Sequence, residues 1–344
     1  MSEKILFFSI DRLGDFLIRS SVIKKISENY KYNEIICSDI NSKLISTQSY
    51  FNKIFIFDKK KKILNKIYFV KKFFLSKYDS VIVFDGKSFS NFLLLFIKAN
   101  FKYTFIYKKT GTLNLVKFNF MKFLLNIFKI KYTILHSRDI IESDHEDHYP
   151  SKYKSLKKYY KNISDDTYYL EELGSELKLK NFSEYILIHF DEKMDKIKNI
   201  DTKLFQTLNQ LSINTNKKII ISCFNYSSNF FLNLKFKIYN YKDLFNETKI
   251  NEKIIIIKDT PLDYFYILIK NSFVNISAHA GFVTHTSFCL NKNCIDIIST
   301  DLKSWLNAWI QFQLNYFQIF MDNNGEKKDI LDLFKDIEKK VNEL

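Results

Sequence analysis

Short apolar runs alternate with longer amphipathic stretches along most of the chain, and this alternation constrains the fold more than any other feature. The first run, KILFFSI at 4–10, precedes a helical stretch that begins near Asp15. Apolar runs of this length are typical of strands buried on both faces, as in parallel sheets, whose crossover connections are usually helices. The sequence therefore predicts an α/β fold in which helices cover both faces of mostly parallel sheets.

The alternation occurs twice, which indicates two similar domains in tandem. At about 150 residues per domain, a chain of 344 residues also suggests two domains. We predict a first domain over 1–135, a linker over 136–183, a second domain over 184–327 and a C-terminal helix over 328–344. The predicted strands are 4–10, 34–37, 53–57, 80–84 and 102–107, then 185–190, 218–222, 253–257, 273–277 and 294–298.

The predicted linker interrupts the alternation with an acidic, histidine-rich stretch, HSRDIIESDHEDHYP. Its histidines, His136, His145 and His148, lie among carboxylates that could bind a metal ion. The HEDH spacing is not that of an i, i+4 pair on one helix face, and a linker is a poor place for catalysis. We therefore expect no metal site.

Scarce residue types limit the functions open to the chain. With six glycines it has neither GxxxxGK[ST] nor GxGxxG, which excludes a P-loop and an ordinary dinucleotide-binding motif. Its four cysteines form no CxxC pair, which fits a reducing compartment. The N-terminal residues lack the apolar segment of a signal peptide, and no apolar run approaches the roughly 18 residues of a membrane span. We expect a cytoplasmic protein.

The positive charge of the chain is confined to its N-terminal part. The formal net charge is +15, yet residues 1–131 hold 25 Lys and Arg against nine Asp and Glu, a net of +16, and 132–344 have a net of −1. Such one-sided charge indicates an anionic partner: nucleic acid, a membrane surface or an anionic substrate. Nucleic-acid-binding motifs are absent and arginine, the preferred reader of bases, occurs three times, so we expect no nucleic-acid partner.

Two basic segments, 59–77 and 113–131, combine lysines with apolar residues at helical spacing. This composition is typical of helices that lie in a membrane interface. It is also that of an ordinary amphipathic helix whose apolar face packs on a sheet. Because both segments fall within the basic domain, we predict peripheral contact with an anionic membrane through them, with packing on a sheet as the alternative.

The first candidate site follows the first strand, in the sequence SIDRLGD. In open parallel sheets, ligands bind at the carboxyl ends of strands, where loops enter helices. Gly14 permits a tight turn or the close approach of a ligand, and Arg12 could face an anion. Asp15 could act on a substrate, but aspartate is also a preferred N-cap at the start of a helix.

The second candidate site is the sequence SAHAGFVTHT, between a predicted strand and a predicted helix. It contains Ser277, His279, Ala280, Gly281 and His285. A glycine-bearing turn into a helix presents free backbone N–H groups and the positive end of the helix dipole, which suits a phosphate. The alternative is a sharp turn with two incidental histidines.

The third candidate site is the loop that follows the predicted strand at 185–190. It carries Lys193, Lys196 and Lys198, whose ammonium groups could meet a diphosphate as point charges. In a chain so rich in lysine, an ordinary solvated loop is the alternative.

Three segments resemble glycosyltransferase family 9, the ADP-heptose:lipopolysaccharide heptosyltransferases and their relatives. ILFFSIDRLGDFLIRSSVIKKI is similar to the family's first strand, its R-LGD turn and the following helix. VNISAHAGFVTHTSFCLNKNCIDII resembles the strand–(S/D)xG–xxH–helix–strand block of the family's donor side. YILIHFDEKMDKIKNIDTKLFQTL resembles the strand, phosphate-binding loop and helix that begin the second domain. Between 31 and 183 only the strand–helix rhythm matches.

The resemblance implies a GT-B fold, with two Rossmann-like domains whose parallel sheets face a central cleft. It implies an inverting glycosyltransferase without metal or cofactor, with a nucleotide-sugar donor on the second domain and an anionic glycan or glycolipid acceptor on the first. Asp15 would be the general base, and Arg12 and Gly14 would lie on the acceptor side. The donor side would comprise a lysine of 193–198 together with Ser277, His279, Ala280, Gly281 and His285.

The donor segments depart from the family pattern in three places. The family's proline-glycine turn after the first strand of the second domain is replaced by Phe190-Asp191-Glu192. The family often has an acidic residue two positions before the glycine, and here that residue is His279. The family's glycine and histidine are three positions apart, whereas Gly281 and His285 are four apart. The donor sugar is therefore left open. Two other functions remain as alternatives: a GT-B nucleotide-sugar epimerase or hydrolase, and a non-catalytic basic protein that binds membrane surfaces.

Overall fold

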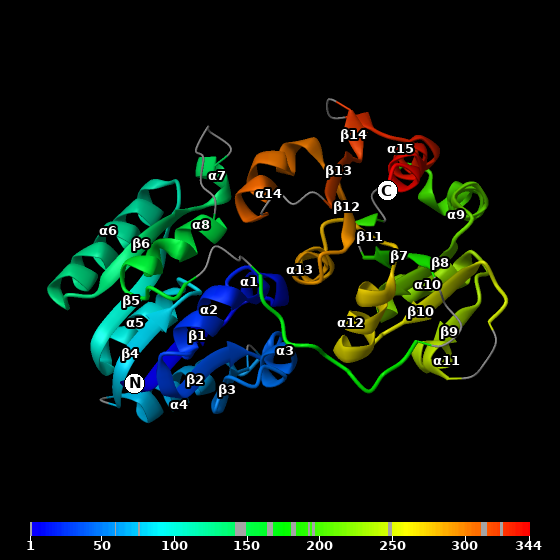
Figure 1. Ribbon diagram of the computed structural model, residues 1–344. Helices are drawn as coiled ribbons and strands as arrows, with labels where there is room; N and C mark the ends of the chain where they lie inside the picture. The colour runs from blue at the N-terminus through cyan, green and yellow to red at the C-terminus, as the bar shows by residue number, and fades with distance from the viewer. Residues whose placement is uncertain are drawn as a thin grey trace. The chain divides into compact units, whose positions relative to one another are not determined.

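The structure is a computed structural model of the chain and contains two compact units (Figure 1). Unit 1 comprises Met1–Glu171 and Ser304–Gln311, and unit 2 comprises Glu172–Lys303 and Phe312–Leu344. Each unit is built on a parallel sheet of its own. The structure describes residues 2–58, 60–74, 76–141, 149–163, 168–179, 184–191, 193–194, 197–246, 250–310, 315–323 and 326–344.

Unit 1 contains a six-stranded parallel sheet in the order β3-β2-β1-β4-β5-β6. Its strands are β1 Ser2–Ser9, β2 Tyr30–Ser38, β3 Lys53–Phe57, β4 Lys77–Val83, β5 Lys98–Lys108 and β6 Lys131–His136. Strand β1 pairs with β2 on one side and with β4 on the other, so the strand order reverses there. The carboxyl ends of β1 and β4 therefore form the topological switch point, where ligands of open α/β sheets bind.

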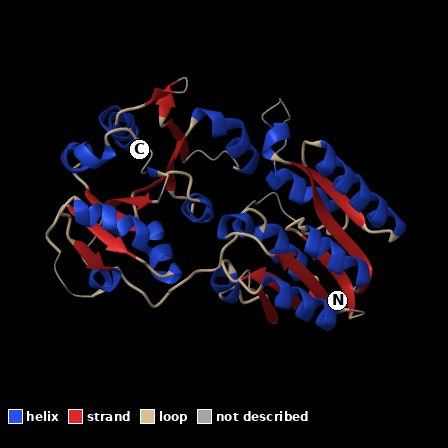
Figure 2. Cartoon of the chain, turned by 180° about the vertical axis from the view of Figure 1, so that it is seen from behind, coloured by secondary structure: helices blue, strands red, loops and turns tan. Residues whose placement is uncertain are grey.

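Helices of unit 1 pack on its sheet (Figure 2). They are α1 Leu13–Leu17, α2 Ser20–Ser27, α3 Ser42–Ser46, α4 Lys62–Phe73, α5 Ser88–Phe96, α6 Thr112–Ile127, α7 Arg138–Ile141, α8 Tyr149–Tyr153 and the 3-10 helix η1 Lys154–Lys158. Helices α4, α5 and α6 share one apolar core, in which Phe69, Leu94 and Phe118 pack with Leu6 and Val83 of the sheet. Burial of these side chains is what holds the three helices against that face.

A short segment from late in the chain belongs to unit 1. Helix α14, Lys303–Trp309, carries two tryptophans, and the ring of Trp309 stacks on Tyr149 at 3.9 Å between centroids. Trp305 meets the same tyrosine ring edge to face. Aromatic pairs of this kind add to the free energy of burial, which explains why residues 304–311 join unit 1.

Unit 2 contains a seven-stranded parallel sheet in the order β13-β12-β11-β7-β8-β10-β9. Its strands are β7 Tyr185–Phe190, β8 Lys218–Cys223, β9 Ile238–Asn240, β10 Ile254–Lys258, β11 Val274–Ser277, β12 Asn293–Ile298 and β13 Tyr316–Phe320. Strand β7 pairs with β8 and with β11, so the switch point lies at the carboxyl ends of β7 and β11. A two-stranded antiparallel ribbon, β14 Asp322–Asn323 with β15 Glu326–Lys327, follows the sheet.

Helices also cover the sheet of unit 2. They are α9 Ile200–Thr215, α10 Asn225–Asn233, α11 Tyr241–Phe245, α12 Leu262–Asn271, α13 Gly281–Cys289, α15 Ile330–Asn342 and the 3-10 helix η3 Thr300–Leu302. The C-terminal helix α15 packs beside α9, where Leu333 and Ile337 join Leu204 and Leu208 in the core. Its polar residues, at the intervening positions, face away from that core, as expected for an amphipathic helix.

The predicted α/β fold with two parallel-sheet domains is confirmed, and every predicted strand is present. Three strands of the parallel sheets, β6, β9 and β13, were not predicted, and neither were the two strands of the ribbon, β14 and β15. The helix predicted from Asp15 is two helices, because the turn at Ile18–Arg19 separates α1 from α2. Residues 149–163 fall in the predicted linker but belong to unit 1. The predicted C-terminal helix is part of unit 2. The boundaries between the units therefore differ from the predicted domain boundaries.

Candidate functional site

At the switch point of unit 1, carboxylates gather around one arginine. The Arg19 guanidinium, 1 % exposed, pairs with the carboxylate of Asp11 and donates to the Ser9 hydroxyl at 3.1 Å. It also lies over the rings of Phe84 and Tyr153. A buried cation is retained only where charges and hydrogen bonds compensate it, so Arg19 is the centre around which this turn is built.

A second carboxylate ties the turn to the neighbouring strand. Asp85, just beyond the end of β4, is buried and accepts a hydrogen bond from the backbone N–H of Ile10 at 3.0 Å. Its oxygens also accept from the Lys87 backbone at 2.8 Å and from the Ser90 hydroxyl at 2.9 Å. Burial raises the pKa of Asp85, and the charge of Asp11 raises it further. These bonds fix the path of the chain out of β1.

Asp15 lies at this switch point in helix α1. It is the third residue of the helix, and Arg12 is the N-cap, so the interpretation of Asp15 as an N-cap is wrong by position. Its carboxylate instead bonds back to the Arg12 backbone N–H at 3.1 Å. Burial raises the pKa of Asp15 above its ordinary 3.8, and the Asp11 charge raises it further, against the opposing effect of Arg19. A carboxylate in this setting holds a proton more tightly than one in water.

The other two residues predicted for the acceptor side flank Asp15. Gly14 is buried inside α1 and does not have a positive φ, so the tight turn expected of it does not occur. Arg12 is exposed at the start of the helix, and its guanidinium is open to solvent. The structure therefore brings the three predicted residues together, with Asp15 as the partly buried group.

In unit 2 the structure joins two of the candidate segments at the switch point. The Lys193 ammonium, from the loop after β7, donates to the backbone carbonyls of Ala278 at 3.1 Å and His279 at 2.7 Å, in the turn after β11. The Asp191 carboxylate, 3.6 Å from this ammonium, accepts from the Lys193 backbone N–H at 3.0 Å. One lysine side chain thus links loops that are 85 residues apart in sequence.

The turn after β11 leads into helix α13 as predicted. The helix begins at Gly281, with Ala280 as its N-cap, and the Ala280 N–H donates to the Ser277 hydroxyl at 3.3 Å. His279 has a φ of +49°, a left-handed conformation that is uncommon for a residue with a side chain. The first backbone N–H groups of α13 lack partners within the helix, and this end of the helix dipole is positive, an arrangement suited to a phosphate.

His279 is held by a buried carboxylate. Its Nδ1 lies 2.6 Å from Asp296 of β12, whose side chain is fully buried and also accepts from the Tyr316 hydroxyl at 3.0 Å. With Nδ1 engaged by Asp296, the orientation of the ring is fixed and Nε2 is its second hydrogen-bonding atom. The family pattern has an acidic residue at the position of His279. In this chain, the carboxylate that contacts His279 is that of Asp296, on strand β12.

The remaining donor-side residues differ in their placement. His285, inside α13, is buried, and burial together with the nearby His279 lowers its pKa to about 3, so its imidazole is neutral at physiological pH. Lys198 is exposed, and its backbone bridges to Asp329 before α15. Lys196 lies outside the described residues. Of the three candidate lysines, Lys193 is the one seen to reach the turn before α13.

A metal ion needs several ligating side chains close together in the structure. In the part of the chain that it describes, no three His, Cys, Asp or Glu side chains come close enough together to hold a metal ion. The histidines His145 and His148 of the predicted linker lie outside that part. The absence of a metal site in the complete chain stays a prediction.

Comparisons with known proteins decide the fold. No protein-family model and no curated protein sequence matches the chain. A glycosyltransferase family 9 protein from Veillonella parvula superposes with a TM-score of 0.67 over 100 % of this chain and 98 % of its own, at 11 % identity. Escherichia coli heptosyltransferase WaaC, solved with ADP, gives 0.67 over 97 % and 99 %, at 11 % identity. The E. coli ADP-heptose heptosyltransferase II gives 0.64 over 99 % and 98 %, at 13 % identity.

The chain has the fold of the family 9 glycosyltransferases. This GT-B fold class comprises two parallel-sheet domains, as predicted. At sequence identities of 11–13 %, the similarity shows the fold alone. The roles of individual residues therefore rest on the geometry given above.

Three residues of these sites were not predicted from the sequence. Arg19 stood out as one of three arginines, yet nothing in an amphipathic helix pattern indicated that it is buried. Asp296 offered a clearer signal, since it is a lone acid within the apolar strand NCIDII. Asp85 offered a similar signal, as the residue that ends an apolar strand.

Proposed function

We propose that the chain is an inverting, metal-independent glycosyltransferase that moves a sugar from a nucleotide-sugar donor to a glycan or glycolipid acceptor. The observation that carries the proposal is the contact of Lys193 with the turn before α13, because it assembles a cation and a helix N-terminus at one switch point. The family 9 fold supports it, as do the structures of E. coli WaaC, which were solved with ADP and with ADP-2-deoxy-2-fluoro heptose.

Unit 2 would bind the donor. The diphosphate would lie at the N-terminus of α13, where Gly281 lets the phosphates approach the backbone. The Lys193 ammonium would add a full positive charge, and His279, in its doubly protonated form, would donate one further hydrogen bond from Nε2. Together these groups stabilise the charge that develops on the leaving diphosphate, the task a metal ion performs in other enzymes.

Unit 1 would bind the acceptor and activate it. The Asp15 carboxylate would take the proton from the acceptor hydroxyl, whose oxygen then attacks the anomeric carbon of the donor sugar. A new C–O bond forms on the opposite face while the bond to the diphosphate breaks, so the configuration inverts. A raised pKa makes Asp15 a stronger base than an ordinary carboxylate. Arg12, exposed beside it, would face a negative charge on the acceptor.

The nature of the acceptor follows from charge. Residues 1–131 carry a net charge of +16, which favours an anionic acceptor such as a lipopolysaccharide core, a capsular glycan or a lipid-linked glycan. The four cysteines are unpaired in the structure, which supports a reducing location such as the cytoplasm, where nucleotide sugars are made. The proposed reaction uses no cofactor.

The test is release of nucleoside diphosphate from nucleotide sugars, measured with and without added acceptor glycans. A transferase releases diphosphate at a rate that depends on the acceptor. Release without acceptor, or conversion of the sugar on the nucleotide, would support a hydrolase or epimerase instead. If no nucleoside diphosphate binds, the proposal fails and a non-catalytic surface-binding protein is left.

A further inference from the structure

Helix α6 is apolar on two opposite faces. One face packs on the sheet of unit 1, where Phe118 and Leu125 are buried in the core. A second set of apolar side chains is spaced three or four residues apart, so its members share a different face of the helix. This set is 55–67 % exposed and comprises Leu113, Val116, Phe120, Phe123 and Ile127.

Helix α4 repeats this arrangement on the same side of the sheet. Its buried residues, Phe69 and Phe73, belong to the core that also holds Phe118 of α6. Its outer face carries apolar side chains that are 51–74 % exposed, namely Ile63, Leu64, Ile67 and Tyr68. We call the exposed apolar residues of the two helices the α4–α6 face. Packing on the sheet explains the buried residues of 59–77 and 113–131 but not this face.

The charged side chains of these helices have one sign. Helices α4, α5 and α6 contain no aspartate or glutamate, and neither residue occurs anywhere from Gly86 to Arg138. Lysines accompany the apolar residues, among them Lys66, Lys71 and Lys72 on α4 and Lys117 and Lys122 on α6. An apolar surface on helices that carry lysines and no carboxylates complements a surface that is apolar inside and negative at its boundary.

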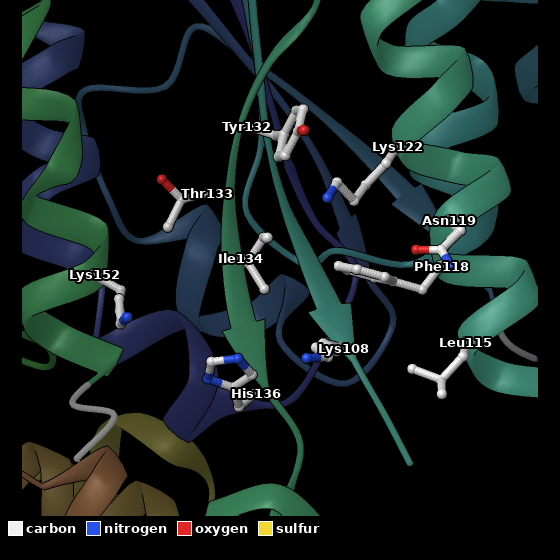
Figure 3. A pocket seen from close by; sticks show the side chains of 10 residues that line it. All are labelled: Lys108, Leu115, Phe118, Asn119, Lys122, Tyr132, Thr133, Ile134, His136 and Lys152. Carbon is white, nitrogen blue, oxygen red and sulfur yellow. The ribbon is translucent and has the colours of Figure 1, made fainter. Parts of the chain in front are cut away.

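A groove beside α6 extends the basic rim. It lies between α6 and the edge strand β6 and has a volume of about 560 Å³ (Figure 3). Phe118 and Lys122 project into it from α6, and Lys108 and Lys152 line it from the end of β5 and from α8. No carboxylate is among its lining residues, so the groove suits a phosphate group attached to an apolar body.

We propose that the α4–α6 face docks the protein on the surface of an anionic phospholipid bilayer. The apolar side chains would enter the boundary of the acyl chains, and the lysines would meet the phosphates. None of the helices within the described residues is long and apolar enough to cross a membrane, and α6 would lie along the surface. A second copy of this chain is a poorer occupant, because a symmetric contact would set lysines against lysines. The docking surface does not depend on the proposed reaction.

The experiment is flotation of the full chain with vesicles. Phosphatidylcholine vesicles containing about 30 % phosphatidylglycerol should carry the protein upward, and about 0.5 M salt should weaken this binding. The double variant Phe120→Ser/Phe123→Ser should lower partition to these vesicles about tenfold or more, because it removes two exposed rings that the bilayer would bury. Lys117→Gln/Lys122→Gln should lower it several-fold on anionic vesicles.

The matched control is Phe205→Ser/Ile213→Ser, which removes two equally exposed apolar side chains from α9 of unit 2 and should leave partition unchanged. All substituted positions are exposed or at the surface, so thermal unfolding in solution should be unaltered. Equal binding to neutral and anionic vesicles, or equal loss in the control, would overturn the proposal. So would a dimer in light scattering that Phe120→Ser/Phe123→Ser dissociates, since the face would then be an interface between copies.

Discussion

The ammonium group of Lys193 lies 2.7 Å from the backbone carbonyl oxygen of His279, which joins the loop after β7 to the turn before α13. Both segments lie at the carboxyl ends of adjacent strands, at the switch point of the unit 2 sheet. A flexible side chain held there by two carbonyls keeps its charge beside the helix N-terminus. The same ammonium can exchange a carbonyl for a phosphate oxygen when a donor binds.

The first prediction concerns this lysine. Lys193→Met should raise the dissociation constant for a nucleoside diphosphate about tenfold or more, since a charge-assisted hydrogen bond to phosphate is lost. Lys198→Met is the matched control, because Lys198 is exposed and its backbone, not its side chain, makes its contact with Asp329. Isothermal titration of both variants measures the difference. Equal affinities would remove Lys193 from the donor site.

The second prediction concerns the proposed base. Asp15→Asn should lower kcat by about 10²- to 10⁴-fold, the usual contribution of a general base, and leave donor affinity unchanged. The amide oxygen can still accept from the Arg12 backbone, so helix α1 should persist. Single-turnover kinetics and donor titration separate the two effects. Full activity in this variant would assign the proton transfer to another group.

The third prediction is the stability of the same variant. The folded-state pKa of Asp15 is raised, so its protonated form stabilises the fold below the unfolded pKa, and this contribution is lost as pH rises through the folded pKa. Above the folded pKa, the wild-type carboxylate is ionised at a cost that asparagine avoids. Asp15→Asn should therefore unfold at a temperature no lower than wild type at pH 7, with the difference vanishing in acid. A clear loss of stability at pH 7 would contradict the raised pKa.

The fourth prediction follows from the buried arginine. Arg19→Met should destabilise the protein by about 3–5 kcal/mol, the usual result of leaving a buried charge, here Asp11, without its partner. Arg12→Met, at an exposed position seven residues earlier, should change stability by no more than about 0.5 kcal/mol. Urea unfolding reports both values. A mild effect of Arg19→Met would show that Asp11 finds compensation elsewhere.

The sequence predicts the turns of these sites better than their contacts. Rare residues near strand ends, such as Gly14 and Gly281, identify the turns because glycine favours the places where strands enter helices. The contact of Lys193 with His279 depends on β7 lying next to β11, and strand order is set by packing across the sheet. Local spacing therefore cannot separate Lys193 from Lys198.

The remaining differences have local causes. Strand β6, Lys131–His136, begins shortly after the basic helix α6 ends at Ile127. In the sequence, the short apolar centre of this strand resembles a continuation of that helix. The break between α1 and α2 places Arg19 where it reaches Asp11, a contact that helical periodicity does not encode. The two-faced helix α6 satisfies the pattern of an amphipathic helix on its inner side, and only the structure shows that its outer side is apolar as well.

The central claim is that unit 2 binds a nucleoside diphosphate through Lys193 and the start of α13. The most direct measurement is thermal unfolding of wild type and Lys193→Met with ADP, GDP, UDP and, as a control, CMP. A ligand at a hundred times its dissociation constant stabilises the folded state by about 2.7 kcal/mol, which raises the unfolding temperature by several degrees. We predict that one diphosphate shifts wild type in this way and shifts Lys193→Met much less. The absence of any shift with all three diphosphates would contradict the claim.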